Sequence, residues 1–173
     1  MKRIRPLLLL LLFTIATAAR ADFNDGVVAY LMADYEKAFT TMQALAETSD
    51  HGYAQYYMGM MYLKGQGVDQ DYKTASNWLR KASEKNIPQA QYKLGDLYFK
   101  GRGVPKDYEY AYIWFSVGAS HKHNLSEKAI NKAKTKLSDE ELKEADKVIA
   151  TYIKKYGPSE DIDPTKPIRI ENE

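Results

Sequence analysis

The sequence contains an internal repeat with a period of 36 residues, and this repeat constrains the fold more than any other feature. The segment Lys64-Gly65-Gln66-Gly67-Val68 returns as Lys100-Gly101-Arg102-Gly103-Val104. Single residues match at the same offset, pairing Ala54 with Ala90, Gly59 with Gly95, Tyr62 with Tyr98, Asp71 with Asp107, Ala75 with Ala111 and Trp78 with Trp114. A fixed period of this length is typical of stacked supersecondary units.

Each unit is predicted to be two helices joined by a glycine loop. Ala54, Met58 and Tyr62 follow one another at helical spacing and form a single stripe in the first helix. The second helix has a wider apolar face, made of Ala75, Trp78, Leu79 and Ala82 in the first unit. The loop between them predicts a left-handed helix end at Gly65 and a helix start capped by Asp71.

Two further glycines, Gly59 and Gly95, fall inside the first helices, where glycine costs about 1 kcal/mol relative to alanine. We expect them to allow a neighbouring helix backbone to approach closely, with Trp78 and Trp114 filling the adjacent space. Both tryptophans are therefore predicted to be core residues, in preference to platforms for a bound sugar.

These residues closely resemble the Sel1-like repeat (SLR) family, whose 36-residue units are related to tetratricopeptide repeats. Residues 54–82 meet the family pattern with Met58 in place of leucine, and residues 90–118 meet it with Gly118 in place of the last alanine. The resemblance implies an all-α fold, an α/α solenoid of helical hairpins in a right-handed superhelix. It also implies a protein-protein interaction adaptor as the function.

Around the repeats, the sequence predicts less regular units that close the ends of the stack. The expected order is a degenerate hairpin over 22–53, repeats over 54–89 and 90–125, capping helices over 126–157 and a flexible tail over 158–173. One helix is expected over about 125–137. A capping box at Ser138 and Glu141 opens the last helix, which is expected to run to about Tyr156 with an apolar stripe.

The N-terminus is typical of a secretory signal peptide. Basic residues precede an apolar run from Leu7 to Ile15, and Ala19-Arg20-Ala21 fits a cleavage site, so residues 1–21 are predicted to be removed after Ala21. The apolar run is shorter than a membrane span. We therefore expect a periplasmic or secreted protein with no stable membrane insertion after cleavage. The remaining chain has slightly more acids than bases, which argues against a nucleic-acid partner.

The sequence shows no constellation of catalytic residues. It has no cysteine, which excludes thiol catalysis and zinc-thiolate sites. His121 and His123 lie in one turn without further ligands at a recognisable spacing, and His51 is expected to be solvated. Asp71 and Asp107 recur at helix starts and are interpreted as caps. We expect no enzyme activity, no cofactor and no metal.

By analogy with the tetratricopeptide groove, a partner protein or peptide is expected to bind the concave face formed by the first helices. The predicted partner-binding residues are Tyr53, Tyr56, Met60, Tyr92, Asp96 and Phe99, with Leu63, Lys64, Gln89 and Lys100 beside them. Large apolar groups on such a face favour binding of a peptide or helix. The alternative is that neighbouring or C-terminal helices cover these rings.

Two other functions stay open at this point. Some cysteine-rich relatives in the resembled family are associated with β-lactam binding or hydrolysis, which suggests a cell-wall-related enzyme. This chain has neither their cysteines nor a Ser-x-x-Lys sequence, and a nitrocefin assay would test the idea. The other alternative is a self-assembling structural protein, because solenoids can stack end to end; its light scattering would depend on concentration.

Overall fold

The repeat folds as consecutive helical hairpins. The structure is a computed structural model and describes residues 22–158. In this part of the chain the secondary structure is helical throughout, which confirms the predicted all-α class. The elements are α1 (Phe23–Leu31), α2 (Tyr35–Thr48), α3 (Gly52–Lys64), α4 (Tyr72–Glu84), α5 (Pro88–Lys100), α6 (Tyr108–Ser120), α7 (Asn124–Lys134) and α8 (Asp139–Tyr156).

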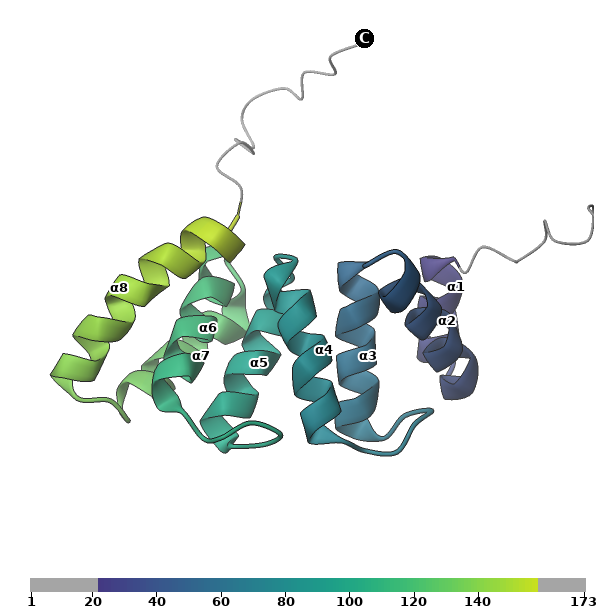
Figure 1. Cartoon of the computed structure of the whole chain (residues 1–173), viewed down its shortest axis with the longest axis horizontal. Coiled ribbons are helices and arrows are strands. Elements are labelled where there is room, and N and C mark those ends of the chain that lie inside the picture. The colour runs from purple at the N-terminus through teal and green to yellow at the C-terminus, as the bar shows by residue number, and fades with distance from the viewer. Residues whose placement is uncertain (1–21, 159–173) are drawn as a thin grey trace, which may run out of the picture.

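The hairpins lie side by side along the long axis of the molecule (Figure 1). Each helix from α1 to α6 packs on the next one, and α8 packs on α6. The glycine loops of both repeats lie along one edge, the lower one in Figure 1. The short turns between hairpins lie along the opposite edge, where α8 also ends. The molecule therefore has two edges of different construction.

The predicted helix ends are confirmed in both repeats. Gly65 and Gly101 end α3 and α5 with φ of 67°, the left-handed conformation that glycine adopts most easily. Asp71 accepts hydrogen bonds from the backbone N–H groups of Lys73 and Thr74, and Asp107 caps α6 in the same way. Local sequence therefore sets where these four helices end or begin.

The second glycine of each loop has a role beyond turning the chain. Gly67 and Gly103 also have positive φ, of 71° and 72°. A Cβ atom on Gly67 would lie 2.3 Å from the carbonyl oxygen of Tyr35, and one on Gly103 would lie 2.0 Å from that of Tyr72. Each loop thus packs directly on the backbone at the start of the preceding unit's second helix, which links one unit to the next.

The helical glycines allow the predicted close approach, but the residues that fill the space differ from the prediction. A Cβ on Gly59 would lie 2.6 Å from Cγ of Leu79, and one on Gly95 would lie 2.7 Å from the ring of Phe115. The assignment of this space to Trp78 and Trp114 was wrong. Leu79 shares a helix face with Ala75 at i, i+4 and lies next to Gly59 of α3. Trp78 instead packs on a neighbouring cluster made of residues from α2 and from the first half of α3.

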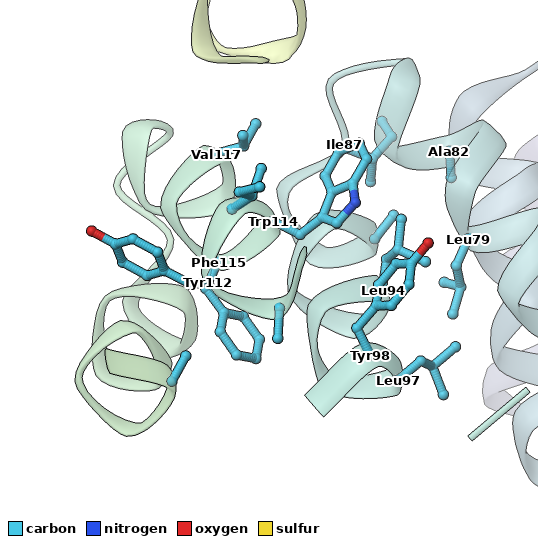
Figure 2. Close-up of a cluster of buried hydrophobic side chains, with 14 of the residues drawn as sticks. Leu79, Ala82, Ile87, Leu94, Leu97, Tyr98, Tyr112, Trp114, Phe115 and Val117 are labelled. Carbon is cyan, nitrogen blue, oxygen red and sulfur yellow. The ribbon is translucent and has the colours of Figure 1, made fainter. Parts of the chain in front are cut away.

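The main core is formed by residues from α4 to α8, and Figure 2 labels its part between α4 and α6. Trp114 is 2% exposed and packs there, as predicted. Trp78 is only partly buried, against a separate cluster of Met42, Ala46, Ala54 and Met58, so its prediction as a full core residue was too strong. Equivalent repeat positions therefore differ in burial because different elements cover them.

The C-terminal helices close the stack. Residues 135–137, expected to extend α7, lie outside it. The predicted capping box is present, with Ser138 and Glu141 bonding to each other's backbone. Ala145 of α8 is fully buried against the core, and the Tyr112 hydroxyl donates to Asp146 at 2.8 Å. Burial first, and then the hydrogen bond to Asp146, raise the pKa of Tyr112 to about 12.

Some predictions fall on residues that the structure does not describe. The signal peptide over residues 1–21 and the tail beyond Pro158 lie outside the described residues. Within residues 22–158, none of the helices combines the length and the apolar character that crossing a membrane requires.

Candidate partner-binding surface

The six predicted partner-binding residues come from α3 and α5, the first helices of the two repeats, and we call their surface the first-helix face. Tyr53 is 43% exposed, whereas Met60 is 9% exposed and largely unavailable to a partner. The other four are partly buried: Tyr56, Tyr92, Asp96 and Phe99. The face is therefore less open than the sequence suggested, but most of its residues retain some accessible surface.

The N-terminal half of this face is an aromatic cluster completed by α1. The ring of Tyr56 lies 5.7 Å from that of Tyr57, which in turn lies 5.1 Å from that of Tyr30 on α1. Lys64 donates to the Tyr30 hydroxyl at 3.1 Å. Burial raises the pKa of Tyr56, and the neighbouring Tyr57 adds to the shift, so the phenol is neutral across the physiological range. This half presents uncharged aromatic edges.

The C-terminal half of the face encloses a pocket of about 220 Å³ between α5, α6 and α7. Three of the predicted residues, Tyr92, Asp96 and Phe99, line it. Its other walls come from Phe115 of α6 and from Leu125, Lys128, Ala129 and Lys132 of α7. An aromatic and aliphatic interior with charged groups at the rim can hold one apolar side chain of a partner.

The charges at this pocket are partly paired. Asp96 forms an ion pair with Lys100 at 2.6 Å, one helical turn away. The ammonium of Lys132 lies 4.8 Å from the ring centroid of Phe99, within cation–π range. Lys128 lines the pocket and is exposed, with no ion pair among the described residues. A carboxylate on a partner would meet Lys128 at this rim.

The α7 residues are the part of the surface that sequence reasoning missed. Leu125, Ala129 and Lys132 lie at i, i+4 and i+7, so they share one face of α7. The spacing of these residues could have indicated a shared face from sequence alone. Because α7 lies outside the two clear repeats, however, its sequence could not be aligned with theirs to show which helix that face contacts. The alternative expectation, that terminal helices cover the rings, holds in part, because α7 borders Tyr92 and Phe99 without closing the pocket.

The histidines act as structural residues at helix ends. His51, expected to be solvated, is half-buried, accepts from the backbone of Ala54 at 3.2 Å and stacks on Phe23. His123 caps α7 in the same way, and burial lowers its pKa. His121 lies 3.0 Å from the carbonyl oxygen of Tyr156. Within residues 22–158, no group of three or more acidic or histidine side chains is placed to hold a metal ion.

The fold and this surface define a helical-repeat solenoid whose first helices carry several partly accessible aromatic side chains. Comparison with known families gives the specific class. Residues 52–87 and 88–123 each match the family model described as Sel1 repeat. The chain belongs to the Sel1 repeat family, as the sequence resemblance indicated.

Two solved structures show the same architecture. A protective antigen present in uropathogenic Escherichia coli strains, which displays an SLR fold, has a TM-score of 0.75 and 28% identity, with 87% of this chain covered and 34% of the other. A Sel1 repeat protein from Oxalobacter formigenes has a TM-score of 0.59 and 31% identity, with 63% of this chain covered and 44% of the other. No curated protein sequence matches the chain significantly.

The similarity covers only part of each solved structure. The chain spans about a third of the length of the antigen and less than half of the Oxalobacter protein. It is a Sel1-like repeat protein, a class that typically serves as a protein-interaction scaffold, and Sel1 repeats generally mediate protein binding. The comparisons identify no catalytic domain.

Proposed function

We propose that this protein is an exported adaptor that binds a partner protein or peptide through the first-helix face and α7, without catalysing a reaction. The observation that carries the proposal is the pocket of about 220 Å³ at which Tyr92, Asp96 and Phe99 meet α7. Predicted partner-binding residues from one helix thus share a single concavity with residues from another.

The chemistry of the pocket indicates what the partner offers. Tyr92, Phe99 and Phe115 provide apolar walls, and a buried aromatic or aliphatic anchor is the usual centre of such an interface. Lys128 favours a carboxylate next to that anchor. The volume admits one side chain, and only two full repeats contribute to the face, so the affinity from this surface alone is moderate or weak.

Export is the second part of the proposal. The side chain of Asp22 caps α1 by accepting from the backbone N–H of Asn24 at 2.9 Å. Cleavage after Ala21 would leave that cap and every described helix intact. Mass spectrometry of the protein isolated from a periplasmic extract should give an N-terminus at Asp22. A protein found in the cytoplasm with Met1 retained would contradict export.

Site-specific photocrosslinking in the native cell envelope tests the binding surface. A crosslinker at position 128, at the pocket rim, should capture one defined protein, identified by mass spectrometry. A crosslinker at position 143, exposed on α8 and away from the pocket, is the matched control. Equal capture from both positions, or none from position 128, would contradict the proposed surface.

A paired variant tests the aromatic contribution directly. Replacing both Tyr56→Ala and Tyr92→Ala should abolish capture at position 128, because each removes a ring of the first-helix face. Circular dichroism should show unchanged helical content. Unfolding of this variant would mean that the rings are core residues, which would make the assignment of the face wrong.

A further inference from the structure

A second, larger pocket of about 570 Å³ lies between α2, α3 and α4, outside the first-helix face. Its lining residues Asp50 and Lys85 belong to the turns between hairpins, and these turns lie along the upper edge in Figure 1. Its lining residues are Ala46, Glu47, Asp50, Gln55, Trp78, Lys81, Glu84 and Lys85. The partly buried Trp78 gives it an aromatic wall, and the ammonium of Lys81 lies 4.5 Å from that ring centroid.

The internal repeat shows what fits in a pocket of this kind. Trp114 is the repeat equivalent of Trp78, and the last turn of α8 lies against it. The ring of Tyr152 lies 5.4 Å from that of Trp114 in an edge-on arrangement, and the ring of Tyr156 lies 5.8 Å away. In the second repeat, therefore, the position of the pocket is occupied by the end of a helix with tyrosines at i and i+4.

The backbone at that helix end is also recognised. Gln91 donates from Nε2 to the carbonyl oxygen of Tyr156 at 2.8 Å, and His121 Nε2 lies 3.0 Å from the same oxygen. The carbonyls of a last helical turn have no partner within their own helix, so such donors satisfy them. Two side chains of the second repeat thus bind one terminal carbonyl.

In the first repeat, the side chains at the two equivalent positions both interact with a carboxylate. Gln55, equivalent to Gln91, donates from Nε2 to Asp50 at 2.6 Å, and Lys85, equivalent to His121, forms an ion pair with Asp50. Asp50 is therefore in the place of the Tyr156 carbonyl, as acceptor for the same two positions. Its side chain is 63% exposed, so it can turn away when another acceptor arrives.

We propose that this pocket binds the last turn of an α-helix from a partner protein, with aromatic residues at i and i+4 against Trp78. The terminal carbonyl or carboxylate of that helix replaces Asp50 as acceptor for Gln55 and Lys85. This second docking site lies on a different part of the molecule from the first-helix face, so the adaptor can hold two partners.

The charges of the rim define the partner further. Asp50 and Lys85 take part in the acceptor exchange, and of the remaining charges Glu47 and Glu84 outnumber Lys81, so the rim favours basic side chains on the incoming turn. The last turn of α8 has this composition, with Lys154 and Lys155 between its two tyrosines. The partner therefore carries an aromatic and basic helix end. The α8 of this chain is excluded because its end is already bound at Trp114, and the same holds for a second copy.

The probe for this proposal is a synthetic peptide with the sequence of residues 139–157, added to the full mature protein. The protein has two tryptophans, so their indole N–H signals in a ¹⁵N NMR spectrum report on the two pockets separately. The variant Trp78→Phe assigns them. The Trp78 signal should shift saturably with the peptide, the Trp114 signal should stay in place, and a peptide with Tyr152→Ala and Tyr156→Ala should have no effect.

Two protein variants test the acceptor exchange. Asp50→Asn gives the first repeat the residue found at the equivalent Asn86, whose φ of 60° is similar to the 51° of Asp50. Because it releases Lys85, it should strengthen peptide binding by roughly fivefold, an effect of the size of one hydrogen bond. Lys85→Ala should weaken binding by a similar factor. Lys37→Ala, at an exposed position outside both pockets, should leave binding unchanged.

Several results would overturn the proposal. The first is a Trp78 indole signal that does not move at millimolar peptide. The second is a shift of the Trp114 signal, which would show that the peptide displaces α8. The third is that Asp50→Asn and the parent protein bind the peptide with equal affinity. A Trp78 signal that moves without peptide when residues 159–173 are deleted would assign the pocket to the chain's own C-terminus and would equally overturn it. The two proposals can fail independently. The variant Tyr92→Ala, which tests the first-helix face, lies at the other pocket and should leave the response of the Trp78 signal to the peptide unchanged.

Discussion

At the scale of single residues, the two glycines of one loop have separable roles. Gly65 needs its left-handed φ of 67°, but a Cβ there would meet nothing closer than 3.4 Å. Gly67 has a similar φ of 71°, and a Cβ would also lie 2.3 Å from the carbonyl oxygen of Tyr35. The first glycine is thus required by backbone conformation alone. The second is required by conformation and by contact with the preceding unit.

The substitutions Gly65→Ala and Gly67→Ala should therefore differ in cost. Gly65→Ala is expected to lower the free energy of unfolding by about 1–2 kcal/mol, the usual cost of a left-handed alanine. Gly67→Ala should lower it further, because the contact between units must also open. Urea denaturation measures both values, and Gly65→Asn should recover part of the first loss. Equal losses for the two alanine variants would show that the contact with Tyr35 contributes nothing.

Residue roles were predictable from sequence where the interaction is local. Asp71 and Gly65 act within one turn of the chain, so spacing alone identified them. Gln91 could not be predicted in this way, because its partner Tyr156 lies 65 positions away on a helix outside the repeat. The contact of Gly67 with Tyr35 escaped prediction for the same reason, since it depends on how two units stack.

At the scale of helices, the equivalent tryptophans of α4 and α6 differ in how far neighbouring helices bury them, and this difference sets how much each contributes to stability. Trp114 of α6 is enclosed by α5 and the last turn of α8 and is 2% exposed. Among residues 22–158, no helix end packs on Trp78 of α4, which forms a wall of the 570 Å³ pocket. The same residue type at the same repeat position is a core residue in one unit and a pocket residue in the other.

Replacing these tryptophans should give unequal losses of stability. Trp114→Ala leaves a cavity among α5, α6 and α8 and is expected to cost about 3–5 kcal/mol. Trp78→Ala should cost clearly less, since its ring is already partly solvated and no enclosed cavity results. Thermal and urea unfolding of both variants measure the difference. A loss from Trp78→Ala as large as from Trp114→Ala would mean that the pocket closes around Trp78 in solution.

The start of α4 gives a pH-dependent prediction. The hydroxyl of Thr74 donates to Asp71 at 2.6 Å, and this bond first, then the backbone N–H of Thr74, lowers the pKa of Asp71 below its ordinary 3.8. The folded pKa lies below the unfolded one, so the stabilisation is present above pH 3.8 and is lost as the pH falls through the folded value. Asp71→Asn should lower the melting temperature at neutral pH, and this difference should shrink below about pH 4.

The control for this cap is Asp69→Asn, which removes an exposed carboxylate two residues away that caps no helix. It should leave the melting temperature unchanged from neutral pH to pH 3. If both variants behaved alike, the effect of Asp71 would reflect net charge rather than the cap.

Helices themselves were predictable because both repeats carry the full pattern of stripes, caps and loops. The surfaces that these helices form together were less predictable from the sequence. Part of the first-helix face was anticipated, but its pocket depends on α7, which has no counterpart of matching sequence. The larger pocket was not anticipated at all, because it becomes evident only when the first repeat is compared with the helix end that fills the second.

At the scale of the whole molecule, the two ends of the stack are built differently. The N-terminal end leaves apolar side chains of α1 and the following turn in solvent, with Val28 53%, Leu31 75% and Met32 78% exposed. The C-terminal end is sealed by α8, which carries its apolar stripe onto α6 and its last turn onto Trp114. A solenoid is held by contacts between neighbouring units, so losing the seal should affect mainly the adjacent units.

The substitution Ala145→Asp tests this seal. Ala145 is fully buried between α8 and α6, and a carboxylate without a partner in that position costs several kcal/mol, which detaching α8 relieves. In a Trp78→Phe background, Trp114 fluorescence should then shift to longer wavelength. Amide hydrogen exchange should speed up in α6 and α8 and stay slow in α3. The matched control is Ala150→Asp, exposed on the same helix, which should alter neither signal. Uniformly faster exchange from α1 to α8 would instead show that the stack unfolds as one cooperative unit, with α8 essential to every hairpin.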